Sequence, residues 1–273
     1  MAIVSPDAKL GDNVEVGPFA FIDANVEIGD GCHIMNGATV LRNVKLGKDC
    51  TVFPGAVVGA IPQDLKFEGE ESWVEIGDRV NIRECATINR GTAASGRLVT
   101  RVGSDTLIMS YAHIAHDCIV GNHCIVVSYS GLAGETDLAD WVTIGGKSMA
   151  HQFTKVGTHA FVAANSKLVK DIPPYVLVGR EPVVFEGVNR VGLLRRGFTE
   201  DQVNLIKELY DTIYFKGMNV SQALDYIEAN YPASEIRDTI VGFIRSCKRG
   251  IVSKPRPPRE CSFPAQTSRR WPG

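Results

Sequence analysis

The sequence lacks a run of about 18 apolar residues, the length that a membrane-spanning helix requires. Its first residues, Met1 to Pro6, contain no positively charged segment followed by an apolar one, so they do not resemble a secretory signal peptide. We therefore expect a cytoplasmic protein.

The sequence also lacks an excess of charge of either sign and an even set of cysteines. Its 29 Lys and Arg against 31 Asp and Glu give a net charge of −2, which excludes a strongly basic protein built to bind nucleic acid. Seven cysteines in 273 residues argue against a disulfide framework. Four of them occupy a repeated position that elsewhere holds Ala or Ser, which predicts reduced, inward-facing side chains, with a redox or metal role as the alternative: Cys32, Cys50, Cys118 and Cys124.

What the sequence does have is an aliphatic residue at every sixth position. The first third repeats without exception at Val4, Leu10, Val16, Ile22, Ile28, Ile34, Val40, Leu46, Val52 and Val58. The repeat returns at Ile76, Ile82 and Ile88, and after a shift in phase it runs from Val102 to Leu168, where only Ala150 departs. Repeats this short are typical of a parallel β-helix, in which stacked coils bury side chains that one repeat cannot bury alone. Three hexads predict a triangular coil of roughly 18 residues, stacked about 4.8 Å from the next.

Glycine follows the aliphatic residue in many hexads, as at Gly11, Gly29 and Gly103. Because glycine adopts positive φ without steric cost, we predict that these glycines form the sharp bends between short strands.

The repeat fails in two segments, which we predict to be loops that leave the prism, at 60–73 and 89–101. Insertions in solenoid proteins usually lie on one face, often the binding face. The polar and aromatic residues of the first loop favour a functional role, and for the second loop function and a tolerated surface insertion are equally supported.

The sequence predicts three segments. The first is a β-helix over residues 1–187, and the second is a small helical domain over 188–253, in which Thr199 and Gln202 form a capping box. We expect further helices to begin at Ser221 and at Ser234. The third segment, 254–273, is rich in Pro, Arg and Ser and is predicted to be an irregular tail.

One histidine has the surroundings of a general base. Ile114 and Cys118 point inward, so His116 lies toward the surface side of its coil, with Asp117 beside it to orient the imidazole. The same position holds Gly134 one coil later and Gln152 two coils later. This stack places a base next to a backbone N–H that glycine leaves accessible, the pair that acyl transfer through an oxyanion needs.

Two other interpretations of His116 remain open. The interpretation of His116 as an ordinary polar residue of the surface is equally well supported. Hexapeptide β-helices also bind zinc between subunits, but His113, His116 and His123 do not share one position of successive coils, which disfavours a zinc site within one chain.

The repeat and several motifs together resemble the UDP-N-acetylglucosamine O-acyltransferase family over residues 1 to about 252. The motifs are Gln63-Asp64-Leu65-Lys66, Ile88-Asn89-Arg90-Gly91-Thr92, Ala112-His113-Ile114-Ala115-His116-Asp117-Cys118, Ala150-His151-Gln152-Phe153, Asp171-Ile172-Pro173-Pro174-Tyr175 and Leu194-Arg195-Arg196-Gly197-Phe198. The resemblance implies a left-handed β-helix and a homotrimer with active sites between neighbouring prisms. It also implies the first step of lipid A synthesis, in which acyl carrier protein donates a 3-hydroxyacyl thioester, with no metal and no cofactor.

The resemblance also implies roles for individual residues. His116 would take the proton from the 3-hydroxyl of the sugar, Asp117 would support it, and the Gly134 N–H would donate to the thioester oxyanion. Substrate would be bound by residues of the loops, the cleft and the helical segment: Gln63, Asp64, Lys66, His113, His151, Gln152, Arg195 and Arg196.

Two positions depart from the family pattern or set its specificity. Glu135 stands where the family often has a histidine that contacts the sugar, and a carboxylate can still accept a hydrogen bond from a hydroxyl. Ala164 occupies the position whose side chain, in this family, limits the length of the acyl chain. Because alanine is small, we predict a long 3-hydroxyacyl group.

Three rival functions are weaker. The related N-acyltransferase carries an extra N-terminal uridine-binding domain, whereas the repeat here begins at Val4. A carbonic anhydrase of the γ class would hold zinc, which a metal assay detects. A non-catalytic scaffold would have no reason to align His116 with Gly134.

Overall fold

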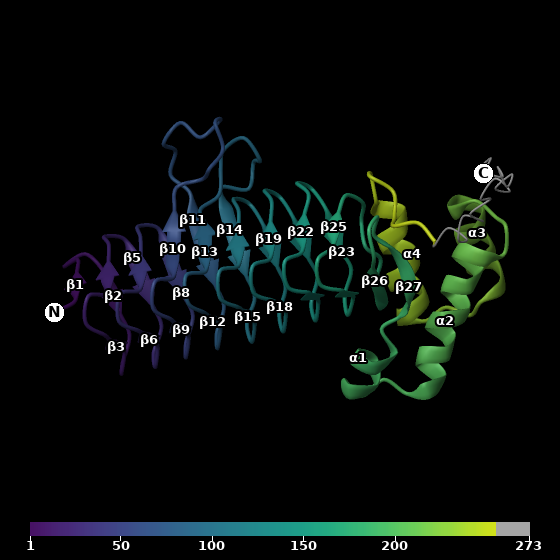
Figure 1. Cartoon of the computed structure of the whole chain (residues 1–273), viewed down its shortest axis with the longest axis horizontal. Helices are drawn as coiled ribbons and strands as arrows, with labels where there is room; N and C mark the ends of the chain where they lie inside the picture. The colour runs from purple at the N-terminus through teal and green to yellow at the C-terminus, as the bar shows by residue number, and fades with distance from the viewer. Residues whose placement is uncertain (255–273) are drawn as a thin grey trace, which may run out of the picture.

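The computed structural model describes residues 1–254 and shows a long prism of short strands with helices packed at its C-terminal end (Figure 1). Of the predicted tail, 254–273, all residues except Lys254 lie outside the described part. Two loops rise from one edge of the prism near its middle, close to β11 and β14 (Figure 1).

Three sheets form the faces of the prism, and the chain visits them in turn. Sheet A contains β1 (Ile3–Val4), β4 (Phe21–Ile22), β7 (Thr39–Val40), β10 (Val57–Ala60), β13 (Thr87–Asn89), β16 (His113–Ile114), β19 (Gly131–Leu132), β22 (Met149–Ala150) and β25 (Lys167–Leu168). Sheet B contains β2 (Lys9–Leu10), β5 (Val26–Ile28), β8 (Val44–Leu46), β11 (Trp73–Ile76), β14 (Val99–Val102), β17 (Ile119–Val120), β20 (Asp137–Leu138) and β23 (Lys155–Val156). Sheet C contains β3 (Glu15–Val16), β6 (His33–Ile34), β9 (Thr51–Val52), β12 (Asn81–Ile82), β15 (Leu107–Ile108), β18 (Ile125–Val126), β21 (Thr143–Ile144), β24 (Phe161–Val162), β26 (Val176–Gly179) and β27 (Val184–Val188).

The strand register confirms the predicted coil length. Ile3 pairs with Phe21, 18 residues later, and the pairing is parallel. Where a loop intervenes the partners are further apart in sequence, as for Val57 and Thr87, yet their strands remain neighbours. The molecule is therefore a parallel β-helix, and its fold class is the left-handed prism that the family resemblance predicted.

The aliphatic repeat forms the interior of the prism. Ile34, Val52, Ile88 and Ile114 are completely buried, and burial of each such side chain stabilises the fold by roughly 1.5–3 kcal/mol. The first coil is the exception, since Val4 and Leu10 are each 39% exposed. Within the described residues no coil stacks on its outer side, so its side chains are covered by one neighbouring coil only.

The expected positive φ was confirmed at Gly59 (φ 89°) but was wrong for the other glycines that follow an aliphatic residue of the repeat. Gly11, Gly29 and Gly103 do not have positive φ. They are needed because coils approach closely: a Cβ at Gly29 would lie 2.7 Å from the carbonyl carbon of Gly47. The left-handed conformation falls two residues later, mostly on side-chain-bearing residues such as Asn13 (φ 56°) and Asp105 (φ 58°).

The four cysteines of the repeat are buried and free, as predicted: Cys32, Cys50, Cys118 and Cys124. Their thiols lie close to carbonyl oxygens of the next coil, as between Cys32 Sγ and Gly47 O at 3.0 Å. They fill a crowded corner in place of alanine or serine.

The C-terminal helices close the last coil. They are α1 (Arg190–Arg195), α2 (Glu200–Phe215), α3 (Val220–Asn230) and α4 (Glu235–Ser246). The predicted capping box of Thr199 and Gln202 is present. The next helix begins at Val220, earlier than predicted, because Asn219 and Gln222 form a second capping box, whereas Ser234 caps α4 as expected.

Buried tyrosine hydroxyls hold α2 against the prism. Tyr210 donates to the carbonyl oxygen of Pro174 at 2.7 Å, and Tyr214 donates to that of Val252 at 2.8 Å. None of the helices within residues 1–254 is both long enough and apolar enough to cross a membrane.

Candidate active site

Both inserted loops and His116 occupy the same edge of the prism, where the chain passes from sheet A to sheet B. We call this edge the A–B corner; the other two edges are the B–C and C–A corners. The loops follow β10 and β13 in two successive coils (Figure 1), and the corner of His116 follows β16 in the third coil. The loops are joined to each other because the backbone N–H of Ala93 donates to Glu70 Oε1 at 2.7 Å. Stacking of coils therefore gathers residues that are far apart in sequence.

The imidazole of His116 lies between two carboxylates. Its Nδ1 is 2.8 Å from Asp117 Oδ2, and its Nε2 is 3.7 Å from Asp64 Oδ2 on the first loop. The prediction of a surface position needs correction, because His116 is only 8% exposed. The side chain points out of the prism as expected, but the loops cover it.

Asp117 is fully buried and accepts several hydrogen bonds from the second loop. The Thr92 N–H lies 2.9 and 3.1 Å from its two carboxylate oxygens, and the Thr92 hydroxyl donates to Oδ2 at 2.7 Å. Burial on its own would raise the pKa of Asp117, but hydrogen bonds from His116, Ser95 and Thr92 outweigh it and lower that pKa. The carboxylate therefore stays ionised beside the imidazole.

The surroundings favour the protonated form of His116. Its pKa is raised above 6.5, first by the hydrogen bond to Asp117, against the opposing effect of burial, and further by the charges of Asp64 and Glu135. With Nδ1 committed to Asp117, Nε2 is the atom free to take a proton from a substrate. This is the arrangement of a general base with an orienting carboxylate.

Gly134 lies directly against the base, as the repeat predicted. A Cβ at this position would collide with Cε1 and Nε2 of the His116 ring, so glycine is needed for the imidazole to sit here. The Glu135 N–H donates to His116 O at 3.0 Å, and the Phe153 N–H donates to Gly134 O at 3.2 Å. Within residues 1–254 the Gly134 N–H donates to no acceptor, which leaves it available to an incoming oxygen.

The remaining residues predicted for the loops and the cleft lie around this corner. Gln63 and Lys66 are exposed on the first loop, and the Lys66 N–H donates to Asp64 Oδ1 at 3.0 Å. Gln152 is half-buried one coil beyond Gly134. Glu135, the residue after Gly134, is also half-buried.

The two neighbouring histidines differ from His116. His113 Nδ1 lies 2.7 Å from Thr87 Oγ1, and burial, followed by the nearby His116, lowers the pKa of His113. His151 is exposed at the next coil but one. Neither imidazole has a carboxylate partner within residues 1–254, so His116 is the better base.

The structure does not bring the arginine pair to His116 within one chain. Arg196 lies over the ring of Trp141, 5.1 Å from its centroid, and its Nη1 is 3.3 Å from His159 Nδ1. These partners belong to the B–C corner. Arg195 and Arg196 line a cleft of about 510 Å³ that continues along sheet C. Ala164 is exposed at the third corner, between sheets C and A.

Sequence reasoning missed several residues of these corners. Arg97 on the second loop forms a two-pronged ion pair with Asp137 and donates to Asp117 O at 2.7 Å. No repeat position marked Arg97 or Thr92, because they lie where the repeat fails, and Thr92 appeared only as the last residue of a family motif, without a role. The stack of His123, Trp141, His159 and Tyr175 was also missed, although these residues recur close to the 18-residue interval.

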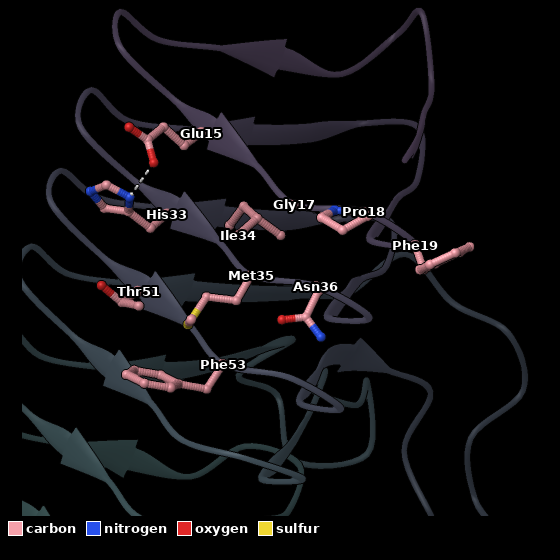
Figure 2. A pocket seen from close by; sticks show the side chains of 10 residues that line it. All are labelled: Glu15, Gly17, Pro18, Phe19, His33, Ile34, Met35, Asn36, Thr51 and Phe53. Carbon is pink, nitrogen blue, oxygen red and sulfur yellow. Dashed lines mark hydrogen bonds and ion pairs between the residues drawn. The ribbon is translucent and has the colours of Figure 1, made fainter. Parts of the chain in front are cut away.

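Another cavity, of about 640 Å³, lies on the N-terminal coils (Figure 2). Its walls include Met35 and Phe53, and its one ion pair within the described chain joins His33 to Glu15 at 3.1 Å. Among residues 1–254 no glycine lies against the His33 ring as Gly134 lies against the His116 ring.

Comparison with known proteins gives the same class of enzyme as the geometry. A family model described as bacterial transferase hexapeptide (six repeats) matches residues 25–60 and 100–134. A second, described as UDP-N-acetylglucosamine O-acyltransferase, domain 2, matches 171–252. The chain is a hexapeptide-repeat acyltransferase.

Relatives over nearly the whole chain narrow this class. A protein of Thiobacillus denitrificans named acyl-[acyl-carrier-protein]–UDP-N-acetylglucosamine O-acyltransferase is 43% identical over 92% of this chain and 97% of its own. One of Pseudomonas fluorescens with the same name is 44% identical, with the same coverage. A crystal structure of a UDP-N-acetylglucosamine acyltransferase from Bacteroides fragilis superposes with a TM-score of 0.90 at 48% identity, covering 92% and 97% of the two chains. The chain belongs to the UDP-N-acetylglucosamine O-acyltransferase family.

Proposed function

We propose that this enzyme transfers a 3-hydroxyacyl chain from acyl carrier protein to the 3-hydroxyl of UDP-N-acetylglucosamine, the first step of lipid A synthesis. The names of the relatives support the two substrates. The observation that carries the chemistry is the His116–Asp117 pair placed against Gly134, whose N–H is available. This pair supplies a base and an oxyanion donor, and both act without a metal or cofactor.

In the proposed reaction His116 Nε2 takes the proton of the sugar hydroxyl as that oxygen attacks the thioester carbonyl. The carbonyl oxygen becomes an oxyanion and accepts a hydrogen bond from the Gly134 N–H. When the intermediate collapses, the carbon–sulfur bond breaks and the thiolate of the carrier protein leaves. The imidazolium returns its proton to that thiolate, so His116 ends neutral and ready for another cycle.

Asp117 orients His116 and stabilises the imidazolium that forms during the reaction. Asp64, 3.7 Å from Nε2, lies where the attacking hydroxyl must enter, so we assign it to holding the sugar. The residues near this corner would complete the binding of sugar nucleotide and pantetheine: Gln63, Lys66, His113, Glu135, His151 and Gln152.

We infer that the working enzyme is a homotrimer with its active sites between prisms. Within one chain the base, the arginine pair and Ala164 occupy three different corners, so a complete site needs a second prism. Arg195 and Arg196 would then meet the nucleotide phosphates in a neighbouring site, since guanidinium groups match phosphate geometry. Exposed Ala164 would leave room for a long acyl chain.

A turnover assay tests the proposal directly. UDP-N-acetylglucosamine is offered with a panel of 3-hydroxyacyl carrier-protein donors of increasing length, and formation of the acylated sugar nucleotide is followed. We expect the highest kcat/KM with long chains. A preference for ten carbons or fewer contradicts the role of Ala164, and no turnover with any donor contradicts the proposed function.

A further inference from the structure

Thr92 contacts the proposed catalytic pair from the second loop. It is 1% exposed, and its hydroxyl donates to Asp117 Oδ2 at 2.7 Å. The same oxygen lies 2.8 Å from His116 Nδ1. Three donors therefore reach this one carboxylate oxygen. The hydroxyl and, at 3.1 Å, the backbone N–H of Thr92 approach it from the loop, and the imidazole approaches it from the prism.

The geometry of the loop sets the direction of the Thr92 hydroxyl. The Ser95 N–H donates to Thr92 Oγ1 at 3.3 Å, so the hydroxyl hydrogen is left to point at Asp117. Gly91 allows the close approach, because a Cβ there would lie 2.7 Å from Asp117 Oδ1 and would collide with Val99 N. The bond from Ala93 N–H to Glu70 ties this part of the loop to the first loop.

We propose that Thr92 is a positioning residue for acyl transfer: its hydroxyl fixes the Asp117 carboxylate and competes with His116 for one oxygen, which limits how tightly the imidazole holds a proton. The inference rests on the proposed function, since it treats His116 as the base. A hydrogen bond to an ionised carboxylate stabilises the charge and makes the carboxylate a weaker acceptor for other donors. Without Thr92 the imidazolium would be held more strongly, and less of the base would be neutral near pH 7.

The other charges around the imidazole do not change when the hydroxyl is removed. Asp64 faces Nε2 from the first loop, Glu135 lies one coil away, and His113 is on the strand before. Arg97 donates to the backbone carbonyl of Asp117 and pairs with Asp137. A shift on substitution of Thr92 is therefore attributable to the shared oxygen.

The test is the pH dependence of kcat/KM in Thr92→Val, which removes the hydroxyl at nearly constant volume. We expect the acid limb to move to higher pH by about half a unit or more, because a hydrogen bond to a charged group is lost. Thr92→Ser keeps the donor and should return the limb toward the native position. Thr106→Val, a change at a threonine that is also 1% exposed but at the B–C corner, should leave it in place.

Three outcomes overturn the proposal. They are an acid limb that stays in place in Thr92→Val with an unchanged rate, a limb that stays in place while the rate falls uniformly, which indicates only a structural role, and a limb that moves to lower pH. If Thr92→Val does not fold, Thr92→Ala removes the same donor with less volume and serves in its place.

A titration that needs no turnover separates this inference from the proposed function. NMR of protein with labelled histidine follows the His116 ring, assigned by the signal missing in His116→Gln. The pKa of His116 should rise in Thr92→Val relative to Thr92→Ser, and no rise contradicts the inference. Full turnover in His116→Gln instead contradicts the base assignment, whichever way the titration falls.

Discussion

At the A–B corner His116 lies 2.8 Å from a buried carboxylate, whereas at the B–C corner His159 stacks against Trp141 and Tyr175 and faces the guanidinium of Arg196. The hydrogen bond to Asp117 raises the pKa of His116, while burial, followed by the charge of Arg196, lowers the pKa of His159 to about 4. One scaffold thus holds a basic histidine and a neutral one. The difference comes from what the loops and helices add to each corner, since the coils themselves are alike.

Removing the base at the A–B corner should cause the largest change in activity. In His116→Ala we expect kcat to fall by about 10² to 10⁴, the usual contribution of general acid–base catalysis. The assay is turnover with UDP-N-acetylglucosamine and an acyl carrier-protein donor. His33→Ala, at an exposed histidine of the N-terminal coils, is the matched control and should retain native kcat. Comparable losses in the two variants contradict a special role for the A–B corner.

Gly134→Ala should disturb the same corner less completely. The added Cβ would collide with the imidazole, so the base must move and we expect kcat to fall by about 10². Gly242→Ala is the control, because a Cβ at Gly242 in α4 meets nothing within 4 Å. Native kcat in Gly134→Ala, with an unchanged fold, would show that the close approach is not needed.

At the B–C corner, His159 should affect how the free energy of unfolding depends on pH. His159 is neutral when folded but takes a proton below about pH 6.5 when unfolded, so the unfolded state binds more protons. The free energy of unfolding should therefore decrease as pH falls from about 6.5 to about 4, by about 2 kcal/mol for this partly exposed group. Denaturant unfolding of the native protein and of His159→Phe across this range measures it. An equal slope in both proteins contradicts the assignment, while His116 contributes with the opposite sign in both.

The smallest effect is expected at the repeat position that holds a buried cysteine at both corners. Cys118 and Cys124 fill the same small position at the A–B and B–C corners, and burial raises the pKa of each thiol to about 12. Cys124→Ala should cost about 1 kcal/mol or less of unfolding free energy and should leave kcat unchanged. Alkylation at pH 8 should modify exposed Cys85 and spare both buried thiols. Rapid labelling of Cys118 or Cys124 in the folded protein contradicts their structural role.

Sequence periodicity could predict the contact between His116 and Gly134 because successive coils are in register. The same argument gave the wrong reason for most of the recurring glycines. Periodicity shows that glycine recurs after the aliphatic residue, but it does not show whether a positive φ or the close approach of two coils requires it. It could not predict the burial of His116, because the covering loops have no repeat. Asn219 as the true start of α3 was missed because Ser221 offered a competing cap.

The six-residue repeat was sufficient to specify the coil, the inward aliphatic side chains and the corner that carries the base, because parallel strands one coil apart must stack. Tertiary structure decided how that base behaves. Thr92 reaches Asp117, and Asp64 reaches His116, only after two irregular loops fold over the prism, where Glu70 joins the two loops to each other. The resulting loss of water and the shared carboxylate oxygen depend on three-dimensional contacts that no spacing along the chain records.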